Sequence, residues 1–463
     1  MKGHIALPLA GALLLAGCIG PRPTAPAGSM VVPPPAWRTT LGPGSPIAAD
    51  WWQAFGDPQL TTLVARALAD SPDLGSAAAR VEEARAQERL ARAQLSPSIT
   101  AGLPVSEGRS VTAFGTGLDQ FGAQPLVQAS YDFDLFGRLR SARAAARAQL
   151  LATEAARDTV RLALAAGVAS GYVSLRALDH RLHIAEETLA ARTEALRIAR
   201  RRAETGYTSN LELRQAEGEY RSNQQLVAAA KLAVTRQENA LSVLVGGAPG
   251  PIQRGLPIDR LNRPAIPDGL PADLLRRRPD LFQAEQALVA ADRSLDSARA
   301  AMLPSLGLTG SAGVVLSNAL ANPITIFSIG GSVLAPIFDA GRLRAQADAS
   351  TARRDQAAFA YRRTALTAFR EVDDSLASVR RSDEQATALA GQRAAQADAL
   401  RIASNRYRAG YSSYLEQLDA QRGLLSAELA LAEAQANRMT AYITLYQAMG
   451  GGWSDAAIRA TAR

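Results

Sequence analysis

The chain has 463 residues, of which 47% are hydrophobic and 5% aromatic, and its formal net charge is +8 at pH 7. The length alone would suggest about three domains, and the scarcity of aromatic residues favours Ala/Leu-rich helices over a bulky globular core. A positive balance could indicate nucleic-acid binding, but 51 basic and 43 acidic residues are interspersed along helical segments, which is typical of a solvated charged surface.

Residues 1–17 are predicted to be a secretory signal peptide, and residues 18–49 a lipidated tether rich in Pro and Gly. The apolar stretch of the signal is shorter than the roughly 20 residues that a transmembrane helix needs. Leu15-Ala16-Gly17-Cys18 resembles a bacterial lipobox, in which the cysteine is lipidated and becomes the mature N-terminus. Cys18 is the only cysteine, so no disulfide competes for it. A cleaved signal with a stray cysteine is the alternative.

The remainder of the chain is a tandem duplication. Pro72-Asp73-Leu74 recurs as Pro279-Asp280-Leu281, 207 positions later, and Gly137-Arg138-Leu139 recurs as Gly341-Arg342-Leu343, 204 positions later. The predicted parts are a first structural repeat at 50–247, a linker at 248–270, a second structural repeat at 271–451 and a C-terminal tail at 452–463.

Two long stretches contain no proline, one between Leu126 and Ala248 and the other after Pro336. Apolar residues recur there every seven positions, for example at Leu175 and Leu182, which predicts long helices packed side by side as in coiled coils. A helix over 138–204 would be about 100 Å long, and no compact globule needs such a length.

Each long helical stretch is interrupted once, by a Gly-Tyr pair. The glycines allow one helix to end, and Ser209-x-x-Glu212 and Ser413-x-x-Glu416 resemble capping boxes that begin the next. Each copy should therefore form a helical hairpin with a tight tip, and both tips should point the same way. The predicted tips are residues 205–209 and 409–413.

Two segments in each copy follow the period of two that is typical of β-strands. In the second copy, Leu306 and Leu308 alternate with Gly307 and Thr309. Each segment has room for the roughly 9–11 residues of a membrane-crossing strand, although soluble hairpins would give a similar pattern. The predicted strands lie at about 97–106, 120–134, 304–316 and 323–336.

Four strands cannot close into a barrel, and lipid does not tolerate the unpaired edges of an open sheet. Several chains would therefore have to share one barrel. Two chains would give eight strands and a filled interior, whereas three would give twelve and leave room for a lumen. Periodicity does not choose between them.

The order of several motifs resembles that of the TolC-like outer-membrane factors, over essentially the whole mature chain. The motifs are DWWQAFGDPQL (50–60), DLFGR (134–138), RRPDL (277–281), PIFDAGRLR (336–344) and GYSSYLEQLDAQR (410–422). The resemblance implies a mixed α/β membrane protein, predominantly α, in which a homotrimer forms a twelve-stranded outer-membrane β-barrel, with four strands per chain. A twelve-helix periplasmic α-barrel continues it.

The lipobox points to the lipoprotein branch of that family, whose members serve resistance-nodulation-division efflux pumps. The resemblance implies a passive channel anchored in outer-membrane lipid. It would receive small molecules from an inner-membrane pump through a periplasmic adaptor (membrane fusion protein) docked at the helical tips. Ducts for drugs, metal ions, solvents and oligosaccharides share this architecture, so the exported substrate stays open.

Matching positions imply a periplasmic gate just after the turn of the second copy. Rings of carboxylates repel one another and need counter-charges to settle their geometry. Glu416 also has a capping role, Asp419 could lie on a solvated face, and Arg422 falls on an apolar seam that calls for a specific partner. The implied gate residues are Leu415 as an apolar constriction, Glu416, Asp419 and Arg422 as a polar link.

The first copy has Gln215 and Gly218 at the positions of Asp419 and Arg422, so the gate would belong to the second hairpin. At the turns themselves, the tyrosines could contact the adaptor or simply seal the turn. The candidate adaptor contacts are Gly206, Tyr207, Gly410 and Tyr411.

Two other classes of function were weighed. His180 and His183, with Glu186 and Glu187 nearby, could hold a metal on one helix face, but no other ligands cluster with them. A lipidated structural protein with periplasmic coiled coils and no pore is the second alternative, and amphipathic strands argue against it. We expect no enzyme activity, no cofactor, no metal and no nucleic-acid partner.

Overall fold

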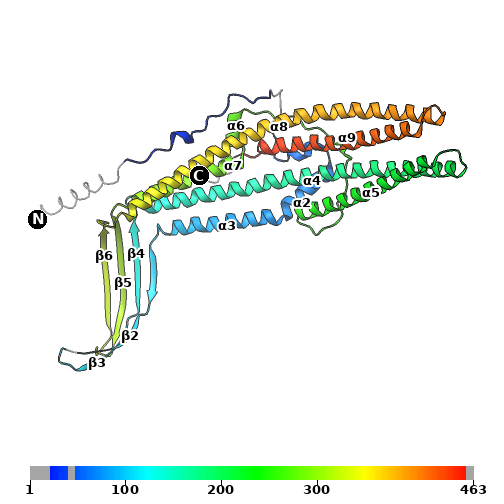
Figure 1. Cartoon of the computed structure of the whole chain (residues 1–463). Coiled ribbons are helices and arrows are strands. Elements are labelled where there is room, and N and C mark those ends of the chain that lie inside the picture. The colour runs from blue at the N-terminus through cyan, green and yellow to red at the C-terminus, as the bar shows by residue number, and fades with distance from the viewer. Residues whose placement is uncertain (1–20, 40–46, 112, 455–463) are drawn as a thin grey trace. The chain divides into compact units, whose positions relative to one another are not determined.

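The computed structural model describes residues 21–39, 47–111 and 113–454 (Figure 1). It divides into two compact units, and each unit takes segments from both copies of the repeat. Of the described residues, those within Met1–Met30, Arg80–Glu154 and Gln283–Arg363 form unit 1. Those within Val31–Ala79, Ala155–Phe282 and Thr364–Arg463 form unit 2. Cys18 and the end of the C-terminal tail lie outside the described residues.

The helices occur in equivalent pairs. Helices α3 and α7 have 22 residues each, α4 and α8 have 67 each, and α5 and α9 have 35 each. Their bounds are α3 Pro72–Ala93, α4 Arg138–Glu204, α5 Asn210–Leu244, α7 Pro279–Ala300, α8 Arg342–Arg408 and α9 Tyr414–Ala448. Shorter elements are η2 Ala27–Ser29, η3 Trp51–Phe55, α2 Pro58–Asp70, η4 Ile258–Arg260 and α6 Pro271–Arg277. Within the described ranges, no helix is long and apolar enough to span a membrane.

The first copy has four strands where two were predicted, because a proline interrupts each of its β segments. Pro104 separates β1 from β2, and Pro125 separates β3 from β4. Proline has no backbone N–H to give to the ladder, so pairing stops and resumes around it. The strands are β1 Ser98–Gly102, β2 Val105–Val111, β3 Gly117–Ala123, β4 Leu126–Phe133, β5 Ser305–Ser317 and β6 Ile324–Leu334.

All strand pairs in the sheet of unit 1 are antiparallel. Strand β1 pairs with β4 and β2 pairs with β3, while β5 pairs with both β3 and β4 on one side and with β6 on the other. The proline breaks therefore leave four ribbons in the order β1/β2, β4/β3, β5 and β6. Two edges stay open within the chain, one at β1/β2 and one at β6.

The register gives the sheet two different faces. Ala101, Val127, Ala312 and Phe327 pair across β1, β4, β5 and β6 on one face, and this face continues through the exposed side chains of Ile99, Ile329 and Val333. The opposite face carries polar side chains at the neighbouring cross-strand pairs. Ser98 and Ser130 share a hydrogen bond of 2.8 Å there, as do Ser311 and Ser328.

The large hydrophobic core lies in unit 2, and the DWWQAFGDPQL motif anchors it. Trp51 and Phe55 are buried, and the Trp51 ring stacks on Tyr446 with centroids 5.6 Å apart. Asp57 is 1% exposed, accepts from the Gln59 N–H that begins α2, and also accepts from the Tyr172 hydroxyl at 2.8 Å. These contacts give the motif a structural role.

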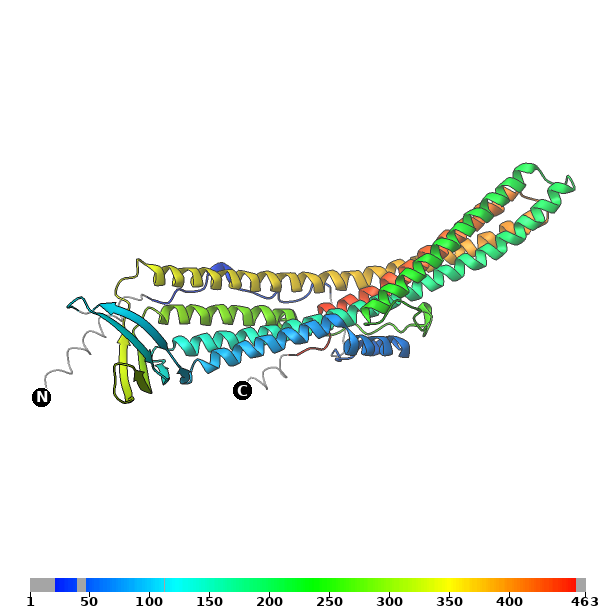
Figure 2. The same ribbon diagram turned by 90° about the horizontal axis from the view of Figure 1, so that it is seen from below.

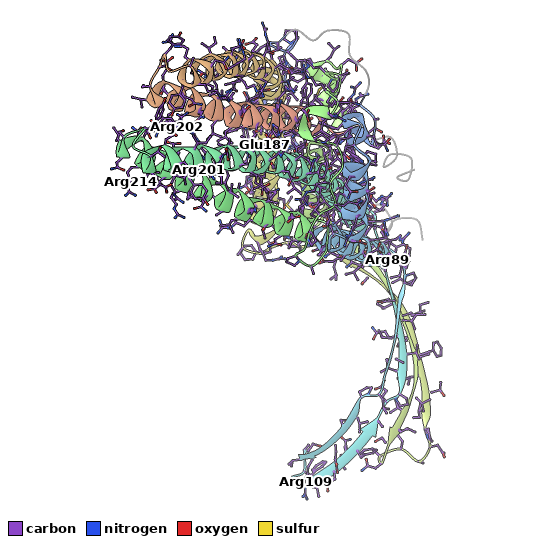
Figure 3. The ribbon with its side chains drawn as sticks, turned by 90° about the vertical axis from the view of Figure 1, so that its right-hand side faces the viewer. Arg89, Arg109, Glu187, Arg201, Arg202 and Arg214 are labelled. Atoms are coloured by element: carbon purple, nitrogen blue, oxygen red, sulfur yellow. The ribbon has the colours of Figure 1, made fainter. Side chains whose placement is uncertain are left out.

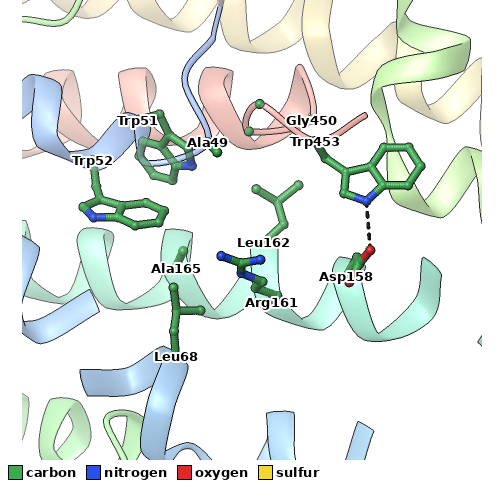
Figure 4. A pocket seen from close by; sticks show the side chains of 12 residues that line it. Ala49, Trp51, Trp52, Leu68, Asp158, Arg161, Leu162, Ala165, Gly450 and Trp453 are labelled. Carbon is green, nitrogen blue, oxygen red and sulfur yellow. Dashed lines mark hydrogen bonds between the residues drawn. The ribbon is translucent and has the colours of Figure 1, made fainter. Parts of the chain in front are cut away.

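The residues that follow α9 pack against the same core. Trp453 donates from Nε1 to Asp158 of α4 at 2.9 Å, beside the small pocket that Trp51, Trp52 and Arg161 also line (Figure 4). The glycines that precede Trp453 permit this packing, because a Cβ on Gly451 would lie 2.3 Å from Leu162 Cδ1.

Candidate functional site at the helical tips

The helical hairpins α4–α5 and α8–α9 have equivalent turns in unit 2, and these turns lie side by side and point the same way (Figures 1 and 2). Gly206 and Gly410 adopt φ values of 70° and 79°, which is left-handed backbone that glycine adopts without strain. The N–H of Tyr207 donates to the carbonyl of Arg202 at 2.8 Å, and Tyr411 repeats the bond to Arg406 at 2.9 Å. These are Schellman-type helix ends.

The two predicted capping boxes are wrong. Ser209 and Ser413 occupy the N-cap positions of α5 and α9, but neither side chain makes a capping hydrogen bond. Both glutamates are bound by residues of α8 instead. Glu416 pairs with Arg406 of the preceding helix at 3.1 Å, and Glu212 accepts from the hydroxyl of Tyr407. The two carboxylates therefore bond to residues of another helix and not to the backbone of their own helix.

Tyr407 is the centre of a contact layer next to the tips that draws one residue from each of four helices. Its hydroxyl donates to Glu212 of α5 and accepts from Arg202 Nη1 of α4 at 2.9 Å. Its ring packs against Tyr414 of α9 with centroids 5.8 Å apart. The Arg202 guanidinium also lies over Tyr207, 5.7 Å from the ring centroid. Arg201, Arg202 and Arg214 can be followed at this end of the first hairpin in Figure 3.

Burial and the bond to Glu212 raise the pKa of Tyr407 to about 12. The phenol is therefore neutral at ordinary pH and can donate its proton to the carboxylate. We call this set of side chains the tyrosine layer, and it consists of Arg202, Glu212, Tyr407 and Tyr414.

A second layer, further from the tips, is built on the buried carboxylate of Glu219. Arg422 Nε donates to Glu219 at 2.8 Å, and Arg192 Nη2 lies 3.2 Å from it. Arg192 also donates to Gln421 of α9. Burial lowers the pKa of Arg192, and the charge of Glu219 opposes that shift. This glutamate layer, Arg192, Glu219, Gln421 and Arg422, links α4 and α5 to α9.

The four implied gate residues are not gathered into one contact network within the chain. Arg422 joins Glu219, and Glu416 joins Arg406. Asp419 is exposed and has no hydrogen bond or ion pair to the described residues, and Leu415 is 57% exposed. The residues that sequence reasoning missed are Arg192, Arg202, Tyr407 and Glu219, the partners of these elements across helices.

Exposed apolar side chains occupy equivalent positions on the two tips. Tyr207 and Tyr411 are 79% and 80% exposed, and Leu211 and Leu415 are 66% and 57% exposed. Single exposed apolar residues need no explanation, whereas here the same pair is exposed on both tips. Gly206 and Gly410 shape the turns, and a Cβ on either would meet no neighbour within 4 Å.

The candidate histidine pair forms no developed metal site. His183 Nε2 lies 3.2 Å from Glu187, and both side chains are exposed. Among the residues placed by the structure, no group of three or more His, Cys, Asp or Glu could hold a metal ion.

A sheet with an apolar face and a polar face suits strands that meet lipid on one side and water on the other. Joined in one chain to helices of 67 residues, it defines a channel protein that spans a membrane with strands and extends from it with helices.

Comparisons with known proteins give the family. The model of the outer membrane efflux protein family matches the chain twice, at residues 63–247 and 270–451. The toluene efflux pump outer membrane protein TtgC of Pseudomonas putida is 35% identical over 94% of this chain and 91% of that protein. The pyoverdine export outer membrane protein OpmQ of Pseudomonas aeruginosa is 35% identical over 97% of each.

Solved structures agree. The crystal structure of the MtrE outer membrane channel of Neisseria gonorrhoeae is 30% identical, with a TM-score of 0.82 over 93% of this chain and 98% of that one. A CusC structure is 31% identical, with a TM-score of 0.82 over 93% and 99%. The chain belongs to the outer membrane efflux protein family. It is an efflux channel of the outer membrane with a periplasmic helical domain.

Proposed function

We propose that three copies of this chain form one channel, a twelve-stranded barrel continued by a twelve-helix periplasmic duct. The channel is passive. It receives small molecules from an inner-membrane resistance-nodulation-division pump through a periplasmic adaptor and releases them outside. The observation that carries this proposal is the sheet of unit 1, which has a lipid-compatible face and two open edges that lipid does not tolerate.

The repeat supplies the register in which the open edges would meet. Ser98 pairs with Ser130 between β1 and β4, and their repeat equivalents, Ser305 and Leu334, pair between β5 and β6. The strand pairing therefore follows the sequence offsets of 207 and 204. Ala129 pairs with Gly310 between β4 and β5.

The equivalents of Ala129 and Gly310 are Val333 at the β6 edge and Leu103 at the β1/β2 edge. We therefore expect Val333 of one copy to face Leu103 of the next. Both side chains are apolar and exposed, at 70% and 62%, so this register continues the apolar face from copy to copy. A twelve-stranded closure leaves a lumen, whereas eight strands would be filled by side chains.

Cysteine cross-linking tests both the register and the number of copies. Val333→Cys combined with Leu103→Cys should give, on oxidation, a covalent ladder of monomer, dimer and trimer, because facing Cβ atoms lie roughly 5 Å apart. The control, Val333→Cys with Ile99→Cys, moves one thiol about 13 Å along the strand and should not cross-link. A ladder that ends at the dimer, or equal cross-linking of the control, would refute the proposal.

We place the adaptor contact at the tips and the gate beside them. The exposed Tyr207 and Tyr411, on turns shaped by Gly206 and Gly410, support an adaptor surface. The unpartnered Asp419 and the exposed Leu415 are free to form rings with equivalent residues of other copies. Glu416 follows Leu415 directly and lies about one helical turn before Asp419. Arg422 contributes by holding α9 to Glu219.

We also propose that Cys18 is lipidated. Supporting this, the first described residues of the tether are bound to unit 1 close to Cys18 in the sequence. Arg22 pairs with Asp292 at 2.6 Å and with Asp296 at 3.0 Å, and Arg354 donates to the carbonyls of Pro23 and Thr24. Mass spectrometry of the membrane-extracted N-terminal peptide tests the modification, and an unmodified Cys18 would disprove it.

A further inference from the structure

Each copy turns from its last strand into its long helix through a short apolar elbow. The first elbow, residues 134–137, contains Leu135 and Phe136, which are 65% and 45% exposed. The second elbow, residues 335–341, contains Ile337 and Phe338, which are 93% and 89% exposed. Both elbows belong to unit 1. The second therefore presents two almost fully exposed large apolar side chains in succession.

Basic residues follow both elbows, but their partners differ. In the first copy, Arg138 pairs with Asp132 at 2.7 Å, and Arg140 pairs with Asp134 at 3.2 Å. In the second copy, the equivalent Arg342 and Arg344 are exposed and have no ion pair with the residues that the structure describes.

Asp339, the nearest carboxylate in sequence, forms no ion pair with either arginine. It accepts from the backbone N–H of Gly341 at 3.1 Å and of Leu343 at 2.9 Å, and so holds the start of α8. The second elbow thus carries two cations without a counter-charge within the described chain.

The position of the second elbow indicates what could supply that counter-charge. Ile337 lies three residues beyond the end of β6 at Leu334, close to Val333 of the apolar face in sequence, at the point where strand gives way to periplasmic helix. This is the headgroup level of a membrane-spanning strand, where basic side chains reach phosphate groups. The ion pairs of Arg22 with Asp292 and Asp296 also fix the tether, four residues after Cys18, on the C-terminal half of α7, which leads into β5.

We propose that the second elbow is a binding site for anionic phospholipid in the periplasmic leaflet of the outer membrane. Ile337 and Phe338 enter the boundary between headgroups and acyl chains, and Arg342 and Arg344 bind the phosphate. The first elbow lacks this specificity, because its arginines are already neutralised within the chain. The proposal rests on the outer-membrane location and goes beyond the channel function.

The test compares two matched double variants of the full-length protein in detergent. Native mass spectrometry would titrate each with phosphatidylglycerol and with phosphatidylcholine and report the ratio of the two affinities. Each basic residue near anionic lipid contributes a preference of about fivefold, so Arg342→Gln with Arg344→Gln should lower the ratio about 25-fold. Arg138→Gln with Arg140→Gln should leave it nearly unchanged, and Arg342→Lys with Arg344→Lys should largely preserve it.

Three results would overturn the proposal. The first is an unchanged ratio in Arg342→Gln with Arg344→Gln, and the second is an equal loss in the first-elbow control. The third is loss of trimers with an unchanged ratio, which would make the arginines a contact between copies. Trimer mass and channel conductance measured on the same samples separate these outcomes from failure of the channel proposal itself.

Discussion

Glu219 is shared by two arginines of very different exposure, and this difference decides what each contributes. The side chain of Arg192 is 3% exposed, whereas that of Arg422 is 59% exposed. A buried charge that loses its partner keeps its desolvation cost, while an exposed one is rehydrated. Glu219 therefore offsets a large desolvation cost of the buried Arg192 and only a small one of the exposed Arg422.

We expect Glu219→Ala to lower the free energy of unfolding by about 3–5 kcal/mol, because it leaves Arg192 buried without a counter-charge. Arg422→Ala should cost only about 1 kcal/mol or less. Thermal and urea denaturation followed by circular dichroism would measure both. Equal losses in the two variants would mean that Arg192 finds another partner or water.

Sequence reasoning identified Arg422 as a residue in need of a partner but did not find that partner. Periodicity reports which face of a helix is buried, and it contains no information on the residue that faces it from another helix. A comparison of the two copies could have identified the partner. The second copy has Gln396 and Gly423 at the positions of Arg192 and Glu219, so the charged pair is unique to the first copy.

At the scale of helices and strands, repeat and period predicted the existence of each long element, while its interruptions depended on local chemistry. The proline-free stretches are two helices of 67 residues and two of 35. The β segments of the first copy were predicted without their breaks, although Pro104 and Pro125 mark them in the sequence. The predicted capping boxes were wrong because the two glutamates bond instead to Tyr407 and Arg406 of α8.

The tyrosine layer should make the folding stability of the hairpins decrease at alkaline pH. The pKa of Tyr407 is raised to about 12, above the ordinary value of 10, because the buried phenol resists ionisation beside Glu212. The unfolded chain releases this proton first, so the stability contributed by the Tyr407 hydroxyl is complete below pH 10 and is lost between pH 10 and 12.

Subtracting the stability of Tyr407→Phe from that of the native protein isolates this contribution, since other tyrosines titrate in both. We expect the difference, measured by thermal denaturation, to be constant up to pH 10 and to shrink toward pH 12. A difference that does not vary over this range would show that Tyr407 ionises as freely in the folded protein as in the unfolded one.

At the scale of the whole molecule, the division into compact units does not follow the sequence duplication. Each unit combines segments of both copies, and in the sheet of unit 1 the copies are joined where β5 pairs with β3 and β4. Unit 2 holds the large core, whereas the apolar cluster described for unit 1 is the small one of Val81, Ala84 and Leu150. The small core and the two open sheet edges of unit 1 are the features from which we propose that neighbouring copies and lipid complete it.

The central claim is that copies of this chain enclose a gated path across the outer membrane. Single-channel recording of the purified full-length protein in planar bilayers tests it most directly. We expect a small resting conductance that rises in Glu416→Ala with Asp419→Ala, because the variant removes the carboxylates of the entrance. No current from either protein, with both correctly folded and inserted, would contradict the account.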